Sequence, residues 1–108
     1  MLIIGIDTIE RHYIPSVRRY WFDADARRFF KSRLPTQAYQ TDDESVAYFV
    51  TSEQQHGHAR RWSVRRYTFA TRDISTVGDF QEYSNRSAAD RRARYLASQM
   101  AVQPAQAA

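Results

Sequence analysis

The sequence predicts a single α+β domain in which an antiparallel meander of three or four strands is packed by a C-terminal helix. Two segments, residues 46–51 and 61–69, combine β-branched and aromatic residues in a way that is typical of strands. Residues 87–100 repeat apolar residues at helical spacing. The chain has 108 residues, 43% of them hydrophobic, which is enough for one core.

The first 16 residues are predicted to be an N-terminal extension of uncertain order, with the domain itself at residues 17–100. Leu2 to Ile6 has the composition of a short strand, but Ile14-Pro15 breaks regular secondary structure soon after it. Residues 101–108 are rich in Ala and Gln and contain a proline, which indicates a disordered tail.

Residues 23–34 fit two structures. In the first, Asp23 caps a short N-terminal helix that places Phe29, Phe30 and Leu34 roughly on one face. In the second, a turn leads into an additional strand that ends at Leu34. A short apolar run is compatible both with the period of a helix and with the alternation of a strand, so both alternatives stay open.

The three predicted strands follow one another along the chain. A polar loop that contains Asp42-Asp43-Glu44 precedes the first strand at 46–51. The second strand, at 61–69, is joined by a hairpin turn to a third at 74–83, in which Gly78 marks a bulge. In the second strand, alternation puts two sets of residues on opposite faces: Ser63, Arg65, Tyr67 and Phe69 on one, and Trp62, Val64, Arg66 and Thr68 on the other.

The C-terminal helix has the clearest start signal in the chain. Ser87 is a suitable N-cap, and Asp90 follows three residues later as in a capping box. Asp90 and Arg94 have the spacing of an ion pair on the helix surface. The apolar stripe that faces the sheet is formed by Ala89, Ala93, Leu96 and Met100. With one helix on one face, the other face of the sheet is expected to be exposed to water.

The composition excludes several kinds of site. The chain has no cysteine, so disulfides, thiolate–zinc sites and thiol nucleophiles are excluded. His56-Gly57-His58 provides only two ligands of the three or four that a tight metal site needs, so a plain polar loop is favoured and no metal or other cofactor is expected. No catalytic motif is present, which predicts a protein without enzymatic activity. Without a long apolar segment, a cytoplasmic protein with no membrane contact is expected.

Arginine and aromatic residues alternate at several points in the chain. The net charge is +4, all but one of the 16 basic residues are Arg, and most of the excess positive charge lies in residues 57–108. Arginine binds phosphate oxygens and flat rings stack on bases, which favours a nucleic-acid surface. The alternative is that the rings fill the core while arginine stems cover them. The candidate residues for contact with nucleic acid or a protein partner are Arg60, Arg61, Trp62, Arg65, Arg66, Tyr67, Arg72, Arg91 and Arg94.

Four segments resemble a family of short uncharacterised proteins of bacteriophages and mobile elements. They are Arg28–Arg33, Tyr48–Glu53, Ser63–Tyr67 and Ile74–Tyr83. This resemblance covers about residues 18–97 and implies a phage setting, without an activity to transfer.

A second resemblance is architectural. Residues 60–100, with an Arg-rich strand, a hairpin, another strand and an Ala-rich helix, are loosely similar to the arm-type DNA-binding domain of phage integrases. The full order is also similar to a double-stranded-RNA-binding domain, but the Lys cluster expected in the last helix of that domain is missing. The likeness to these two nucleic-acid-binding domains implies a nucleic-acid partner.

Two functions are therefore predicted. The first is a small nucleic-acid-binding protein of a phage or mobile element that uses its Arg/aromatic face. The second is an anti-defence protein, similar to anti-CRISPR proteins, that inhibits a host nucleic-acid-handling complex by direct protein–protein contact. The excess of positive charge slightly favours the first.

Overall fold

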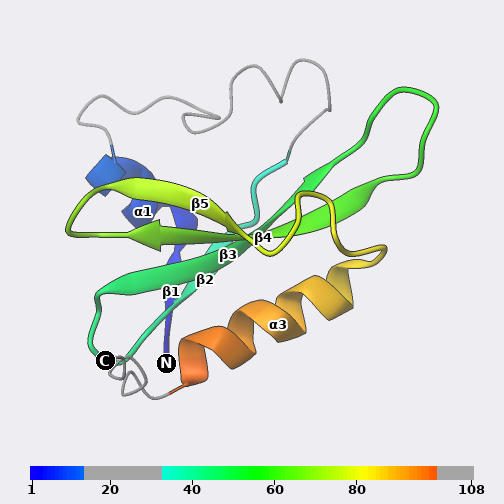
Figure 1. Cartoon of the computed structure of the whole chain (residues 1–108). Coiled ribbons are helices and arrows are strands. Elements are labelled where there is room, and N and C mark those ends of the chain that lie inside the picture. Colours follow the sequence, from blue (N-terminus) through cyan, green and yellow to red (C-terminus); the bar gives the residue numbers. More distant parts are fainter. Residues whose placement is uncertain (14–32, 100–108) are drawn as a thin grey trace.

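The protein folds into a five-stranded antiparallel sheet with a helix near each end of the chain (Figure 1). The computed structural model describes residues 1–13 and 33–99. Along the sheet the strands lie in the order β1-β2-β3-β4-β5, which is also their order in the sequence. The elements are β1 (Leu2–Gly5), α1 (Ile6–Tyr13), β2 (Gln37–Gln40), β3 (Val46–Glu53), β4 (Arg61–Thr68), β5 (Asp73–Val77) and α3 (Arg86–Ser98). The α+β class, the meander and the C-terminal helix are as the sequence predicts.

Strands β3 and β4 form the centre of the sheet. They pair along their whole length, from Val46 opposite Thr68 to Glu53 opposite Arg61. Both strands were predicted, because their β-branched and aromatic residues suit a pleated surface that is packed on both sides. The predicted third strand was too long, since β5 ends at Val77. Gly78 has a φ of 74°, which turns the chain away from the sheet until Tyr83 rejoins it.

The N-terminal segment belongs to the sheet. Leu2 to Gly5 pairs with Gln37 to Gln40, so β1 and β2 add two strands at one edge. The short strand expected at residues 2–6 is present as β1, within a segment that was expected to be an extension of uncertain order, whereas no strand was predicted at 37–40. The two glutamines of β2 hide its strand character, but Ala38 and Tyr39 between them are buried on opposite faces. The predicted number of strands was therefore too low.

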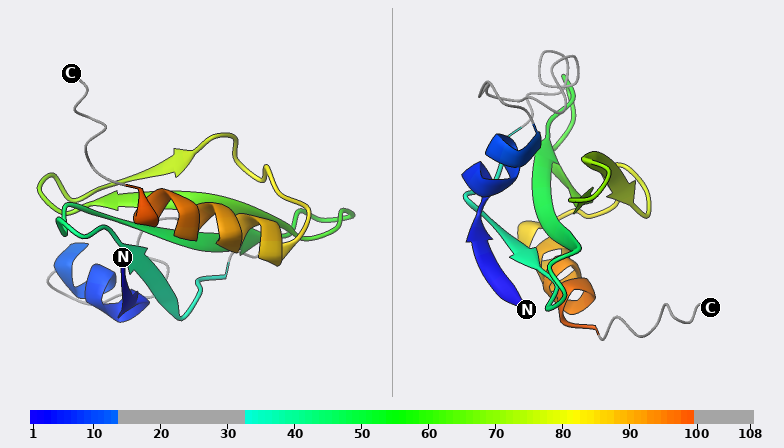
Figure 2. Two further views of the ribbon diagram at one scale, coloured as in Figure 1. Left: turned by 90° about the horizontal axis from the view of Figure 1, so that it is seen from below. Right: turned by 90° about the vertical axis from the view of Figure 1, so that its left-hand side faces the viewer.

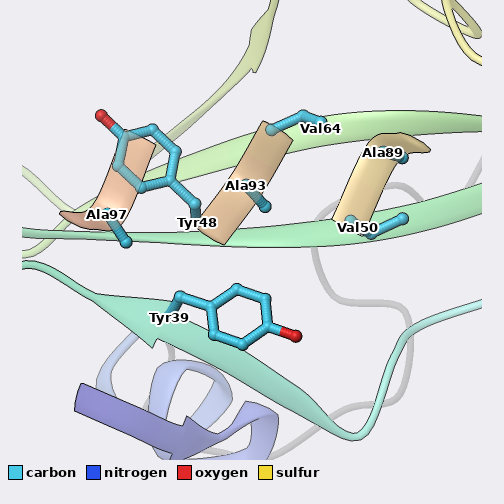
Figure 3. Close-up of a cluster of buried hydrophobic side chains, with 7 residues drawn as sticks. All are labelled: Tyr39, Tyr48, Val50, Val64, Ala89, Ala93 and Ala97. Carbon is cyan, nitrogen blue, oxygen red and sulfur yellow. The ribbon is translucent and has the colours of Figure 1, made fainter. Parts of the chain in front are cut away.

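Helix α3 packs over β2, β3 and β4, and this side is called the α3 face (Figures 2 and 3). The helix contributes small side chains and the strands contribute larger ones, so the helix lies close to the sheet. The buried residues at this contact are Tyr39, Tyr48, Val50, Val64, Ala89, Ala93 and Ala97. Ala89 and Ala93 were predicted for this stripe, while Leu96 is only partly buried.

The opposite side of the sheet, called the α1 face, is covered as well. Ile9 of α1 is fully buried against Ala38, Ala47, Phe49 and Tyr67. The expectation that this side is open to water is wrong here, because the N-terminal segment supplies a second helix with its own apolar face.

The start of α3 differs from the prediction. Asn85 is the N-cap, and its Oδ1 accepts a hydrogen bond from the backbone N–H of Ala88 at 2.8 Å. The cap therefore precedes the predicted one at Ser87. The predicted pair of Asp90 and Arg94 does not form, since both side chains turn to Tyr39 of β2 instead.

The two alternatives for residues 23–34 lie almost wholly outside the described residues, as does the tail at 101–108. Within the described part, Arg33 pairs with Ser52 as an isolated antiparallel bridge, and Leu34 packs at the edge of the core on the α1 face.

Candidate functional site

A pocket of about 380 Å³ opens on the α3 face, beside the end of the sheet where β3 passes into β4. Five parts of the chain form its wall: the segment before β2, β2 itself, the end of β3, the start of β4 and the first turn of α3. The lining residues are Arg33, Leu34, Pro35, Thr36, Gln37, Tyr39, Val50, Ser52, Arg60, Trp62, Arg86 and Asp90.

Three arginines from distant parts of the sequence meet at this pocket, and Ser52 of β3 holds two of them. The backbone N–H of Arg33 donates to the Ser52 carbonyl at 2.8 Å, and the N–H of Ser52 donates back at 3.2 Å. The Ser52 hydroxyl accepts from Nη1 of Arg60 at 2.9 Å. One buried serine therefore fixes the backbone of one arginine and the guanidinium of another.

Arg60 is partly buried and lies near other charged side chains. Burial lowers its pKa, the positive charge of Arg33 lowers it further, and the negative charge of Glu53 opposes them. An arginine stays protonated in proteins, so the guanidinium of Arg60 keeps its positive charge at this position.

Arg86 reaches the pocket as the first residue of α3, directly after the N-cap Asn85. The N-terminal end of a helix carries partial positive charge, which adds to that of the guanidinium. Within the described residues, neither Arg33 nor Arg86 forms an ion pair with a carboxylate. Arg33 and Arg86 thus bring positive charge to the pocket without an ion-paired carboxylate of their own in this part of the chain.

The remaining wall is aromatic and acidic. Trp62 is partly buried against the core of the α3 face, so its ring forms an apolar side of the pocket. The Tyr39 hydroxyl donates to Oδ1 of Asp90 at 2.5 Å, which orients this carboxylate in the wall of the pocket. The pocket therefore joins cations, a flat apolar surface and one oriented acceptor.

The structure brings two of the predicted site residues, Arg60 and Trp62, to the pocket. Arg61 is used locally, because its Nε and Nη2 donate to the carbonyls of Gln81 and Glu82 at 2.7 and 3.0 Å. Four other predicted arginines are placed elsewhere: Arg66 on β4, Arg72 in the β4–β5 turn, and Arg91 and Arg94 on α3.

Arg65 lies in a buried polar cluster on the α1 face and is not a surface contact. Its guanidinium donates to Oε2 of Glu53 at 3.1 Å, to Oγ1 of Thr51 at 2.9 Å and to Oγ1 of Thr76 at 2.8 Å. Glu53 is fully buried and also accepts from Ser63 at 3.2 Å. Arg65 is itself buried, so the structure places this predicted contact residue inside the fold and not on its surface.

Tyr67 is also misplaced in the prediction, which required an exposed ring. Its side chain is fully buried on the α1 face, and its hydroxyl lies 2.6 Å from Nδ1 of His12. The ring also meets Phe69 edge-on. The reason is the alternation of β4, which turns Tyr67 to the side that α1 covers.

Sequence reasoning missed Arg33 and Arg86 as members of the site. Neither arginine lies in the Arg/aromatic strand predicted at 61–69, and 53 positions separate the two in the sequence. The available signals were local: Arg33 precedes Leu34-Pro35, and Arg86 follows a capping asparagine. Neither signal indicates that the two meet.

Two other features of the sequence give no site. His56 and His58 lie in an exposed turn around Gly57, and the described residues contain no cluster of three or more His, Asp or Glu side chains suited to a metal. Asp43, in the acidic loop, accepts hydrogen bonds from the Thr41 hydroxyl and from Ser45, which stabilises the turn before β3. In residues 1–13 and 33–99 no helix is long and apolar enough to span a membrane.

The comparisons with known proteins give a family and no activity. No curated protein and no solved structure matches the chain. Residues 5–94 match a family model described as a family of unknown function (DUF7447), and these residues include all three pocket arginines. Because this match covers most of the chain, the protein belongs to the DUF7447 family.

Proposed function

We propose that the protein is a small non-enzymatic nucleic-acid-binding module whose contact surface is centred on the arginine pocket. The observation that carries the proposal is the convergence of Arg33, Arg60 and Arg86 on one pocket, with no carboxylate paired to the first or the last among the described residues. Guanidinium groups match phosphate oxygens in charge and in fork geometry, so this arrangement suits a phosphate ligand.

The surface extends from the pocket along α3. Arg86, Asp90 and Arg94 are spaced four residues apart, so they lie along one side of the helix. The guanidinium of Arg94 lies over the Tyr39 ring, 5.2 Å from its centroid, and Tyr39 itself lines the pocket. A strand whose phosphate enters the pocket therefore meets a further cation along the helix, as nucleic-acid backbones require.

A second candidate function is inhibition of a host complex by protein–protein contact. The exposed Tyr95 of α3, with the guanidinium of Arg92 5.4 Å from its ring centroid, favours it. Exposed tyrosine and arginine together are typical of the residues that dominate protein interfaces. This pair also lies on the helix but outside the pocket lining, so it is separable from the pocket by mutation.

The test is fluorescence anisotropy of labelled duplex DNA, single-stranded DNA and RNA, titrated with the full chain at low and physiological salt. We expect binding that weakens as salt rises, because phosphate contacts release counterions. The variant Arg33→Ala/Arg86→Ala should abolish most of the binding and lower the salt slope by about 2.

A charge-matched control is Arg66→Ala/Arg72→Asn. Both residues are exposed, and Arg72 lies beyond the far end of β4, roughly 23 Å along the strand at about 3.3 Å per residue. Asn at position 72 tolerates the left-handed φ of 57°. Equal losses in both double variants, or no binding at low salt, would overturn the proposal. A salt-tolerant complex with a protein, lost on Tyr95→Ala, would support the second candidate instead.

A further inference from the structure

We infer that the pocket takes a nucleoside monophosphate group, either as a free nucleotide or as the phosphorylated end of a nucleic-acid strand. The inference rests on the proposed function and specifies which part of a nucleic acid the pocket binds. It follows from the charge, the size and the lining of the pocket.

The charge of the pocket fits a terminal phosphate better than an internal one. A phosphodiester within a strand carries one negative charge, whereas a phosphate monoester carries about −1.5 to −2 near neutral pH. Arg33 and Arg86 belong to the pocket lining, and neither forms an ion pair with a carboxylate among the described residues. A near-dianion with three terminal oxygens satisfies several guanidinium donors at once, which an internal phosphate with two free oxygens does less well.

The size of the pocket indicates one nucleotide. Its volume of about 380 Å³ lies near the lower end of the range for small-molecule sites, roughly 300–1,000 Å³. Trp62 forms a flat apolar wall in the same space, on which a base can stack. A phosphate alone would leave this wall unused.

Asp90 limits what else can enter. Its carboxylate lines the pocket and is oriented by the Tyr39 hydroxyl. A carboxylate accepts hydrogen bonds from a base amine or a sugar hydroxyl. It repels additional phosphates, so a nucleoside triphosphate gains less from the three arginines than its charge suggests.

Isothermal titration of the full chain with AMP, UMP, ATP, adenosine and inorganic phosphate tests this inference. We expect the monophosphates to bind at least about tenfold more tightly than adenosine, inorganic phosphate or ATP, since each lacks one matched contact or adds a mismatched charge. Arg33→Gln and Arg86→Gln should each weaken AMP binding about tenfold or more, while the distant Arg72→Asn leaves it unchanged. A thermal unfolding scan of each variant shows that it is folded.

Competition of unlabelled oligonucleotides against the labelled strand of the anisotropy assay shows whether the ligand is a strand end or a free nucleotide. It also distinguishes failure of this inference from failure of the proposed function. Stronger competition by a 5′- or 3′-phosphorylated strand than by the same strand with hydroxyl ends would identify the strand end as the ligand. Equal competition by all strands, without AMP binding, would overturn this inference and leave nucleic-acid binding intact. AMP binding without any oligonucleotide binding would assign the free nucleotide to the pocket and overturn the proposed function. Inorganic phosphate that binds as tightly as AMP would reduce the pocket to a simple anion site and overturn the inference.

Discussion

Two arginines of one hairpin have opposite surroundings. Arg65 lies on the α1 face with a fully buried carboxylate, Glu53, and two threonine hydroxyls as its partners. Arg60 lines the pocket on the α3 face, where its guanidinium meets a serine hydroxyl and the like charge of Arg33. Arg65 is thus held by a buried carboxylate of the fold, whereas Arg60 lies at the pocket that the proposed function assigns to a phosphate.

On the α1 face, the surroundings of Arg65 follow from its burial together with the oppositely charged Glu53. A buried carboxylate without its cation is costly, so Glu53 and Arg65 depend on each other, and both side chains are buried. In the pocket, positive charges approach one another with no such match at Arg33 or Arg86 among the described residues. Under the proposed function, a bound phosphate would supply the negative charge that Arg33 and Arg86 lack among the described residues.

The largest expected effect comes from breaking the buried pair. Glu53→Ala removes the carboxylate from Arg65 and should lower the free energy of unfolding by about 3–5 kcal/mol. Urea denaturation monitored by circular dichroism measures this loss. The double variant Glu53→Leu/Arg65→Met should recover part of it, because apolar residues of similar size then fill the site. A loss below about 1 kcal/mol for Glu53→Ala would show that the pair does not stabilise the fold.

A smaller effect is expected at the start of α3, which carries Arg86 to the pocket. Asn85→Ala removes the cap on the Ala88 N–H and should destabilise the protein by about 1 kcal/mol. Asn85→Ser keeps a capping oxygen and serves as the control. If denaturation midpoints of the two variants coincide well below that of the natural protein, the cap is not what stabilises the helix start.

The α1 face offers a test by pH. Burial raises the pKa of Tyr67, the charge of Arg72 opposes this shift, and Tyr13 adds to it. Above about pH 10 the unfolded chain releases this proton while the native chain keeps it, so stability falls as pH rises through that range. Tyr67→Phe should cost about 1 kcal/mol at pH 7 through the lost contact with His12.

The pH dependence of stability distinguishes the raised pKa of Tyr67 from a general loss of packing in the Tyr67→Phe variant. Between pH 9 and 11, roughly the range where tyrosines titrate, the unfolding midpoint of the Tyr67→Phe variant should decline less steeply than that of the natural protein. The other tyrosines are common to both proteins and cancel in the difference. Parallel curves would contradict the buried, proton-retaining state of Tyr67.

The central strands and the C-terminal helix were predictable because each is encoded locally. The β-branched run at 46–51 indicates β3, and the alanine spacing of residues 89–97 indicates α3, without information from the rest of the chain. A short strand was expected at residues 2–6, where β1 lies, but its place in the sheet was not, and β2 was not expected at all, since four-residue strands with little alternation are stabilised by their neighbours. β2 in particular depends on the two cores that bury Ala38 and Tyr39.

The candidate site was predicted only in part, for a related reason. Arg60 and Trp62 were found because they lie in a visibly Arg/aromatic segment. Arg33 and Arg86 reach the pocket through a single bridge to Ser52 and through the return of α3 across the sheet. The alternation of residues along β4 does not indicate which of its faces is covered by a helix. The burial of Arg65 and Tyr67 was therefore not predictable from the sequence.

The most direct test of the central claim measures stability and binding together in Arg33→Gln. This change removes the like charge beside Arg60, so the unfolding temperature should stay the same or rise slightly, while nucleic-acid binding falls. Calorimetric unfolding and fluorescence anisotropy on one preparation provide both values, with Arg72→Asn as the control for lost charge. A stable variant with weakened binding is the predicted result. Destabilisation comparable to that of Glu53→Ala, or binding equal to that of the natural protein, would contradict the claim that Arg33 is placed for a ligand.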